Sequence, residues 1–334
     1  MAFYVIGPKN SSYGLGGITI LFEDFCRVMD ESSTEYVLID SNPRNYTSKS
    51  QLFLRFMKLV FSLRSDDRVM LHATATQLVV FGFVLALVSQ LVGCAFVIRK
   101  FAGSFDEYYL KSNKIVKAII DFVLRKANIV YFETIKLVDF FGQKYDNVRY
   151  FPNVRPSTSK RTSVALGDPI KIVFLSQVRI DKGVVDLIES IKSFPNFHLD
   201  IYGKIIDNDV LSLESEQVVF KGQIDNSEVY DVLSCYNIFV LPTYFKGEGY
   251  PGAIIEAMMV GLPIIASNWG GIAEMGDSIT LVEPKNVKQI SAALSTVVLN
   301  YSETRRFTLE ESIRYNSDFV SSAVLKEVKE IGSR

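Results

Sequence analysis

Residues 243–275 read TYFKGEGYPGAIIEAMMVGLPIIASNWGGIAEM, and this stretch decides the fold of the second half of the chain. Pro251 suits the first position of a helix, and Gly261 followed by Pro263 ends it. The apolar run PIIAS after the helix reads as a buried strand. A loop, a helix and a strand in succession are typical of a parallel α/β sheet, which binds ligands outside the carboxyl ends of its strands. We therefore expect chemistry in the loop before the helix.

Two carboxylates of this stretch are candidate site residues, Glu248 in the loop and Glu256 about two turns into the predicted helix. The helix is apolar except for Glu256, so that carboxylate is buried and needs hydrogen-bond donors, which the two adjacent hydroxyls of a ribose would supply. Gly247, Gly249 and Gly252 let the backbone approach a ligand closely, and the amides at the helix start favour an anionic or hydroxyl-rich group. The alternative is a structural Glu256 bonded to neighbouring backbone.

A second candidate lies upstream, where IKIVFLSQVRIDKGVVDLIESI, residues 170–191, predicts a strand that leads through Arg179 and Lys182 into a helix. Cations before a helix N-terminus oppose its dipole, and an anion resolves the conflict. Guanidinium, ammonium and amide groups together can hold a diphosphate without a metal. The alternative is a pair of solvated loop cations with Asp181 as partner.

The rest of the chain extends the same pattern over 334 residues, a length that favours two domains with a cleft between them. Short β-branched or aromatic runs alternate with helical patterns almost from end to end, which predicts two doubly wound parallel sheets. We expect one domain over 1–155, with the last helix, 318–334, packing back on it. We expect a Pro-, Ser- and Thr-rich linker over 156–169 and a second domain over 170–317.

Composition narrows the class of protein. The residues are 48% hydrophobic and 22% charged, which excludes a disordered chain. Three widely spaced cysteines argue against a disulfide framework or a zinc cluster, and the N-terminus begins directly with a strand pattern, so we expect a cytoplasmic protein. The apolar segment 77–98 is long enough to span a bilayer, but Gln90 and the pair Gly93–Cys94 divide it, which favours a buried helix followed by a strand.

Charge is distributed unevenly along the chain. Residues 1–160 contain 20 Lys and Arg against 14 Asp and Glu, whereas the remainder contains 16 against 23. The stretches 51–64 and 111–126 combine apolar faces with cations, as do helices that lie on anionic membranes. The alternative is two ordinary amphipathic helices with a solvated basic face.

The motifs of the second half, taken together, resemble the retaining glycosyltransferases of family 4, which have the GT-B fold. R-x-x-K-G stands at Arg179, Lys182 and Gly183, a strand ends at Gly203, and E-x7-E, GLP and GGIAE follow in order. The resemblance implies that Arg179 and Lys182 hold the donor diphosphate and act in catalysis with Glu248, and that Glu256 holds the nucleotide ribose. It also implies that Glu248 and the amides of Tyr250 to Ala253 bind the transferred sugar. The donor-binding residues implied by the resemblance further include Gly203, Gly249, Pro251 and Gly252.

The first half resembles the family more loosely. GLGGITILFEDF, residues 14–25, is similar to the family's Gly-rich loop and first helix, so Gly16 and Gly17 are candidates near the donor phosphates. Many members carry a histidine at the end of the fourth strand, whereas this chain reads VIRKFAGSFDEYY there. The polar candidates for the acceptor side are His72, Arg99, Lys100 and Asp106.

The resemblance implies retaining transfer through an oxocarbenium-like state, in which the cations stabilise the leaving diphosphate and domain closure excludes water. We expect a nucleoside-diphosphate sugar as co-substrate, no metal and no other cofactor. The expected partners are a saccharide or lipid-linked saccharide acceptor and an anionic membrane surface, with no nucleic acid. A role in capsule or O-antigen assembly at the inner face of the cell membrane follows as a hypothesis.

Three rival functions stay open at this point. An epimerase or hydrolase of the same fold would consume the donor without an acceptor, and a binding protein would close over a sugar without chemistry. A dinucleotide dehydrogenase lacks a suitable G-x-G-x-x-G after its first strand. Asp207-Asn208-Asp209 satisfies the D-x-D pattern of metal-dependent glycosyltransferases, but turn chemistry explains it more simply.

Overall fold

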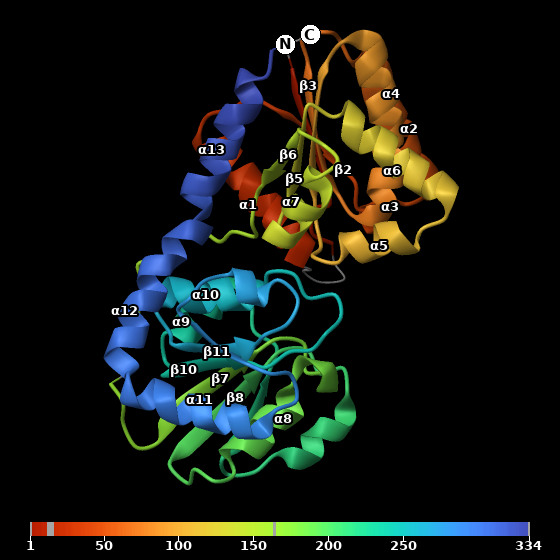
Figure 1. The fold of residues 1–334 in the computed structure, drawn as a ribbon. Helices are drawn as coiled ribbons and strands as arrows, with labels where there is room; N and C mark the ends of the chain where they lie inside the picture. Colours follow the sequence, from red (N-terminus) through yellow and green to blue (C-terminus); the bar gives the residue numbers. More distant parts are fainter. Residues whose placement is uncertain (1, 12–16, 163–164, 333–334) are drawn as a thin grey trace. The chain divides into compact units, whose positions relative to one another are not determined.

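A computed structural model describes residues 2–11, 17–162 and 165–332. The chain divides into two compact units, Met1–Pro156 with Ser317–Arg334 and Ser157–Asn316. Each unit contains one six-stranded parallel sheet with helices against it (Figure 1). The prediction of two doubly wound parallel sheets is therefore confirmed.

The sheet of the first unit has the order β2-β1-β3-β4-β5-β6. Its strands are β1 (Phe3–Gly7), β2 (Val37–Asp40), β3 (Arg68–Ala73), β4 (Ala95–Lys100), β5 (Ile129–Phe132) and β6 (Val148–Tyr150). Its helices are α1 (Gly17–Glu31), η1 (Pro43–Asn45), α2 (Lys49–Ser62), α3 (Ala75–Gln77), η2 (Leu78–Gly82), α4 (Phe83–Val92), α5 (Phe105–Lys111), α6 (Lys114–Lys126), α7 (Ile135–Gly142) and α13 (Ser317–Glu330).

Two apolar cores lie on the two faces of this sheet, because successive side chains of a strand point to opposite faces. Val5 joins Phe22 of α1 and Val324 of α13 in one core. Its neighbour Ile6 joins Phe56 of α2 in the other, which also holds side chains of α4, α6 and α7. Helix cover on both sides buries every residue of β4 and explains why the strands read as continuous apolar runs.

Helix α13 belongs to the first unit although it ends the chain. The guanidinium of Arg27 donates from Nη2 to Ser317 Oγ and to Asp318 Oδ1, each at 2.8 Å. Tyr131 of β5 donates its hydroxyl to Glu327 Oε2 at 2.5 Å. The first unit ends at Pro156 and resumes at Ser317, whereas the second unit begins at Ser157 and so includes most of the segment expected to be a linker.

The sheet of the second unit has the order β12-β11-β10-β7-β8-β9. Its strands are β7 (Ile170–Leu175), β8 (Phe197–Tyr202), β9 (Val218–Gly222), β10 (Ile238–Leu241), β11 (Ile264–Ser267) and β12 (Ile279–Val282). Its helices are η3 (Ile180–Lys182), α8 (Val184–Ile191), η4 (Asn208–Leu213), η5 (Asn226–Glu228), α9 (Val229–Leu233), α10 (Gly252–Val260), η6 (Ile272–Glu274), α11 (Val287–Leu299), α12 (Tyr301–Ser312) and η7 (Ile313–Tyr315).

The segment expected to be a linker is partly built into the second unit. Thr162 is buried, its N–H donates to Val260 O at 2.9 Å, and its hydroxyl donates to Tyr236 O at 2.8 Å. These bonds hold the chain against the second unit before the first strand of that unit.

The long apolar segment forms a helix followed by β4, in the predicted order. Among the described residues, one helical run, Ala75–Val92, is long and apolar enough to cross a membrane, with a mean hydropathy of 2.0. Only 28% of that run is buried. The expectation of a buried helix is therefore wrong for its outer side, although Leu78, Leu85 and Ala86 do enter the core.

Candidate functional site

The loop between β7 and α8 carries both predicted cations. Arg179 is the N-cap of the short helix η3, and Lys182 is the last residue of that helix, immediately before Gly183. Gly183 has φ +78°, and a Cβ there would lie 2.1 Å from the carbonyl oxygen of Pro242. Only glycine therefore lets this loop pack against the end of β10, which brings the loops after β7 and β10 together.

Lys182 and Glu248 form the central ion pair of this loop cluster. Lys182 Nζ lies 2.6 Å from Glu248 Oε2, and each side chain is only 10% exposed. The hydroxyl of Thr243 donates to the same carboxylate oxygen at 2.9 Å. Burial of this kind requires each charge to have partners, so the pair fixes the position of both side chains.

Arg179 is held differently, at the surface. Its Nε and Nη2 donate to the two carboxylate oxygens of Asp181, each at 2.8 Å. The ring of Phe245 lies beside both cations, 5.0 Å from the Arg179 guanidinium carbon and 4.5 Å from Lys182 Nζ. The aromatic face favours cations at this place and leaves their other sides to a ligand.

The loop after β8 supports the cation loop through Gly203 and Asp207. Gly203 has φ +134°, and a Cβ there would lie 1.7 Å from Ser176 O, so the two loops meet backbone to backbone. Asp207 Oδ2 accepts a hydrogen bond from the N–H of Ile180 at 2.8 Å. The first carboxylate of the D-x-D pattern thus caps the cation loop. In the described part of the chain, no group of three or more His, Cys, Asp or Glu side chains is placed to hold a metal ion.

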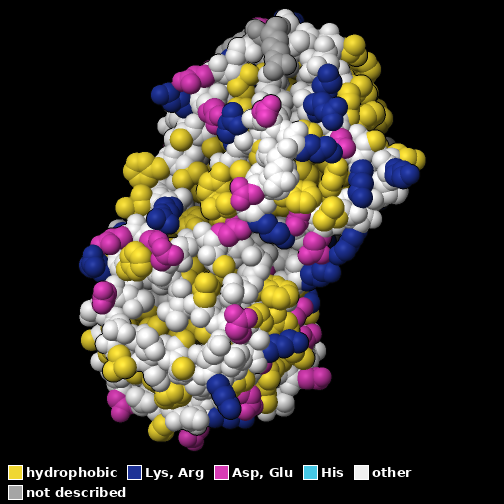
Figure 2. Space-filling view, in the orientation of Figure 1, with side chains coloured by type: hydrophobic (Ala, Val, Ile, Leu, Met, Phe, Trp, Pro, Cys, Tyr) yellow, Lys and Arg dark blue, Asp and Glu magenta, His cyan; other side chains and the backbone are white. Residues whose placement is uncertain are grey.

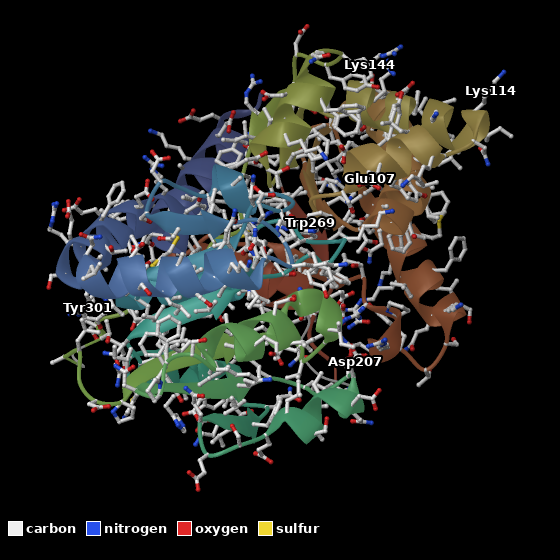
Figure 3. All side chains as sticks on the ribbon, turned by 60° about the horizontal axis from the view of Figure 1, so that its bottom comes forward. Glu107, Lys114, Lys144, Asp207, Trp269 and Tyr301 are labelled. Carbon is white, nitrogen blue, oxygen red and sulfur yellow. The ribbon has the colours of Figure 1, made fainter. Side chains whose placement is uncertain are left out.

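The loop after β11 also contacts this loop cluster. Trp269 Nε1 donates to Phe245 O at 2.8 Å. Gly270, with φ +58°, lies so close that a Cβ would be 2.4 Å from Glu248 O. Figure 3 labels Trp269 and Asp207, which come from the loops after β11 and β8. Four loops at the carboxyl ends of neighbouring strands therefore build one site, as open α/β sheets predict.

Helix α10 presents its N-terminus beside Glu248. Pro251 is the N-cap with φ −60°, no side chain caps the helix start, and the helix runs from Gly252. Glu256 is buried just over one turn into the helix, whereas the sequence placed it two turns in. Tyr250 is also buried and donates its hydroxyl to Glu274 Oε2 at 3.0 Å, which ties the loop to the GGIAE segment.

The chemistry available here is recognition of a group that is anionic at one end and rich in hydroxyls at the other. Arg179 and Lys182 supply charge for phosphate oxygens, and the start of α10 supplies amide dipoles. Glu248 and Glu256 supply acceptors for hydroxyl groups. The sequence analysis did not include Thr243, Phe245 and Trp269 among the site residues. The polar and aromatic residues that directly follow the strand run NIFVLP, and the single tryptophan of the chain, could have indicated them.

One of the two glycine candidates of the first unit lies within the described residues. Gly17 is the first residue of α1 and is exposed, with nothing within 4 Å of a Cβ built on it. Gly16 lies outside the described residues. The predicted helix after the Gly-rich segment is present, and a role of Gly16 and Gly17 in donor binding stays a prediction.

The four acceptor-side candidates lie at the carboxyl ends of β3 and β4 and just beyond, but all of them are buried. His72 is fully buried between Phe22 and Phe25, at ring distances of 5.0 and 4.9 Å, and burial lowers its pKa well below the usual value. The structure therefore makes His72 part of the core between α1 and the sheet, out of reach of an acceptor.

Arg99, Lys100 and Asp106 are likewise enclosed. The Arg99 guanidinium lies 3.5 Å from the Phe151 ring centre and donates to Pro152 O at 3.1 Å. Lys100 donates to Phe101 O, and Asp106 Oδ2 pairs with a lysine of α7 at 2.8 Å. Burial lowers the pKa of Arg99 to about 9 and that of Lys100 to about 8. No acceptor could contact these groups without a rearrangement around them.

Comparison with known proteins shows what this chain is similar to. Residues 157–312 match the family model described as "Glycosyl transferases group 1". Protein CapJ of Staphylococcus aureus is 23% identical over 90% of this chain and 80% of its own length. The putative teichuronic acid biosynthesis glycosyltransferase TuaC of Bacillus subtilis is 28% identical over 37% of this chain and 31% of its own.

A solved structure extends the likeness to the whole fold. The Anabaena protein Alr3699/HepE, crystallised in complex with UDP, matches with a TM-score of 0.75 at 14% identity, over 99% of this chain and 100% of its own. At that identity the match concerns the fold, which is GT-B. The family model covers the second unit, where the loop cluster lies.

Proposed function

Since the chain is a glycosyltransferase enzyme of the GT-B fold, we propose that it moves a sugar from a nucleoside-diphosphate sugar to a saccharide or lipid-linked saccharide. The transfer retains the configuration at the anomeric carbon, as in the family 4 enzymes that its motifs resemble. No metal is required, because side chains and helix dipoles supply the positive charge.

The donor diphosphate binds Arg179 and Lys182. As the glycosidic bond breaks, negative charge grows on the leaving diphosphate, and cations already placed beside it stabilise that charge without reorganisation. Phe245 limits the freedom of both cations, which supports this role. The start of α10 adds amide dipoles on the same side of the site.

The hydroxyl groups of the donor bind the two glutamates. Glu256 accepts from the nucleotide ribose, and Glu248 accepts from the transferred sugar together with the backbone of Tyr250–Ala253. The complex of Alr3699/HepE with UDP supports a uridine nucleotide as the first candidate donor for this fold.

The acceptor belongs to surface polysaccharide assembly. TuaC is named for teichuronic acid biosynthesis, and its match lends this role support. The first unit binds the acceptor, and a lipid-linked acceptor would keep the enzyme at the cytoplasmic face of the membrane.

The ion pair between Lys182 and Glu248 is the observation that carries the proposal. Lys182 Nζ and Glu248 Oε2 lie 2.6 Å apart within the residues matched by the family model, which supports a role of the cation toward phosphate and of the carboxylate toward sugar hydroxyls. A diphosphate linked directly to a sugar is a ligand that needs both groups at such a short distance.

Product analysis tests the proposal. The full chain is incubated with an α-linked nucleoside-diphosphate sugar and a panel of acceptors in EDTA, and the anomeric configuration of the product is read by NMR. An α-linked product that forms only with acceptor supports retaining transfer. A β-linked product contradicts retention, and equal donor turnover without any acceptor favours an epimerase or hydrolase.

A further inference from the structure

Three helices of the first unit, α2, α4 and α6, form a layer over one face of its sheet. Phe56 of α2 packs on Phe81 of η2, with ring centres 4.6 Å apart, and Phe83 of α4 packs on Phe122 of α6 at 5.7 Å. The run from α3 to α4 therefore lies between α2 and α6. The inner side of this layer belongs to the core of the unit.

The outer side of the layer is unusually apolar. In α2, Leu54 is 67% and Phe61 is 84% exposed, and Leu91 at the end of α4 is 85% exposed. Val80, Leu87 and Leu91 lie seven and four residues apart, so they form one stripe along the outside of their helix. Further exposed apolar side chains of this layer are Phe53 and Ile115.

An open groove continues the apolar surface between α4 and α6. Its volume is about 460 Å³, and its lining is apolar apart from one lysine. The lining residues are Phe83, Lys114, Ile115, Ala118, Ile119 and Phe122. Figure 3 shows Lys114 at the outer tip of α6.

The charges on these helices have almost one sign. Lys49, Arg55 and Lys58 lie on α2, whose sequence contains no carboxylate, and the run from α3 to α4 contains no charged residue. Helix α6 adds Lys114, Lys117, Arg125 and Lys126 and has one carboxylate, Asp121. Asp121 already accepts from Tyr145 and Tyr109 and pairs with Lys144. Figure 2 shows hydrophobic side chains with Lys and Arg among them along the edge formed by α4, α2 and α6.

We propose that the outer side of α2, α4 and α6 is a docking surface for an anionic lipid bilayer. Exposed apolar side chains enter the acyl boundary, and the surrounding cations contact lipid phosphates. Each Lys or Arg near an anionic surface contributes about 1 kcal/mol. Seven cations and one carboxylate lie on these helices, so the surface favours an anionic partner. A second copy of the chain would instead bring the seven cations of one copy against the seven of the other.

A lipid-linked acceptor for this membrane-bound enzyme rests on the proposed function. The docking surface itself contains no residue of the donor site. Vesicle binding and donor binding are therefore measured separately, and either can fail alone. A chain that binds anionic vesicles but no nucleotide sugar would keep this surface and lose the proposed function.

Flotation of the full chain with phosphatidylcholine vesicles, with and without 30% phosphatidylglycerol, tests the surface. We expect binding to the anionic vesicles at low salt, weaker binding at high salt and little binding to neutral vesicles. Leu91→Gln should lower the partition coefficient about tenfold. Lys58→Gln should lower it about fivefold.

Leu299→Gln is the matched control, because Leu299 is 84% exposed and, like Leu91, lies at the end of a helix, but in the second unit. It should leave vesicle binding unchanged. The proposal is overturned if wild type ignores anionic vesicles at low salt or if L299Q and L91Q weaken binding equally. It is also overturned if sedimentation shows a dimer that only L91Q dissociates, because a second copy would then cover the surface.

Discussion

Lys182 Nζ lies 2.6 Å from Glu248 Oε2, although the two residues are 66 positions apart in the sequence. The contact joins the loop after β7 to the loop after β10 and neutralises the cation before any donor arrives. A diphosphate that binds Lys182 must therefore compete with Glu248. Sugar hydroxyls that donate to the carboxylate would compensate for the lost contact, so the arrangement favours an intact nucleotide sugar over free pyrophosphate.

Removal of Lys182 should impair both stability and donor binding. Lys182→Ala leaves the buried carboxylate of Glu248 with the hydroxyl of Thr243 as a donor but without its cation, at a cost of about 3 kcal/mol in the free energy of unfolding. The measurement is urea denaturation together with donor titration. The double variant Lys182→Met/Glu248→Gln should lose less stability than the sum of the two single variants while it remains inactive. Strict additivity would mean that the pair does not form in solution.

Gly183 and Gly222 both have φ +78°, and comparing variants of the two tests the close packing of the loops. Gly222→Ala meets nothing within 4 Å, so it should cost only the backbone strain of about 1 kcal/mol. Gly183→Ala places a Cβ 2.1 Å from Pro242 O and should cost about 3 kcal/mol or more and abolish donor binding. Equal losses for the two variants, measured by denaturation, would argue against the loop contact.

Asp207 is either a cap on the cation loop or a metal ligand of the D-x-D pattern, and two variants separate these explanations. If Asp207 acts as a cap on Ile180 N–H, donor binding should depend on Asp207 and should not depend on Asp209, which is exposed. We expect Asp207→Ala to weaken donor binding at least about tenfold, because a hydrogen bond to a charged group contributes about 1.5 to 3 kcal/mol. Asp209→Ala should be neutral. Similar losses for both, relieved by Mn²⁺, would indicate a metal site instead.

Buried Lys100 should make stability depend on pH. Burial lowers its pKa to about 8 from an unfolded value near 10.5. Between these values the unfolded chain binds more protons, so the free energy of unfolding rises with pH across that window. Lys100→Met should remove this rise of about 3 kcal/mol. Denaturation at pH 7.5, 9 and 10.5 measures it, and an identical slope in the variant would show that Lys100 is charged in the folded chain.

The fold was predictable because the signals for it are local. Each strand of both sheets corresponds to an apolar run such as KIVFL or PIIAS, and a glycine marks the end of α4, α7 and α10. The cations at 179 and 182 were also visible, since R-x-x-K-G is one short segment. The position of Glu256 was off by nearly one turn, because Glu256 is only the fifth residue of α10, which begins at Gly252.

Contacts between distant loops could not be predicted from single segments. The pairing of Lys182 with Glu248, the Phe245 ring beside both cations and the Trp269 bond to Phe245 O depend on the strand order β11-β10-β7-β8. Burial of His72 and Arg99 escaped prediction for a related reason. A polar residue at the end of a strand reads as accessible, whereas here α1 and the aromatic rings of neighbouring elements cover them.

Donor binding tests the central claim, that the second unit holds a nucleoside-diphosphate sugar, most directly. The shift in Tm is measured in EDTA with UDP-, GDP- and ADP-sugars for wild type, Arg179→Ala and Glu256→Ala. Lys192→Ala is the control. This exposed lysine pairs with Glu189 and directly follows the last residue of α8, at the opposite end of that helix from Lys182. Saturating donor at 100 times its Kd stabilises the folded chain by about 2.7 kcal/mol. We predict a shift with one nucleotide class that K192A keeps and that R179A and E256A lose. No shift with any donor, or an equal shift in all four proteins, would contradict the assignment of this site.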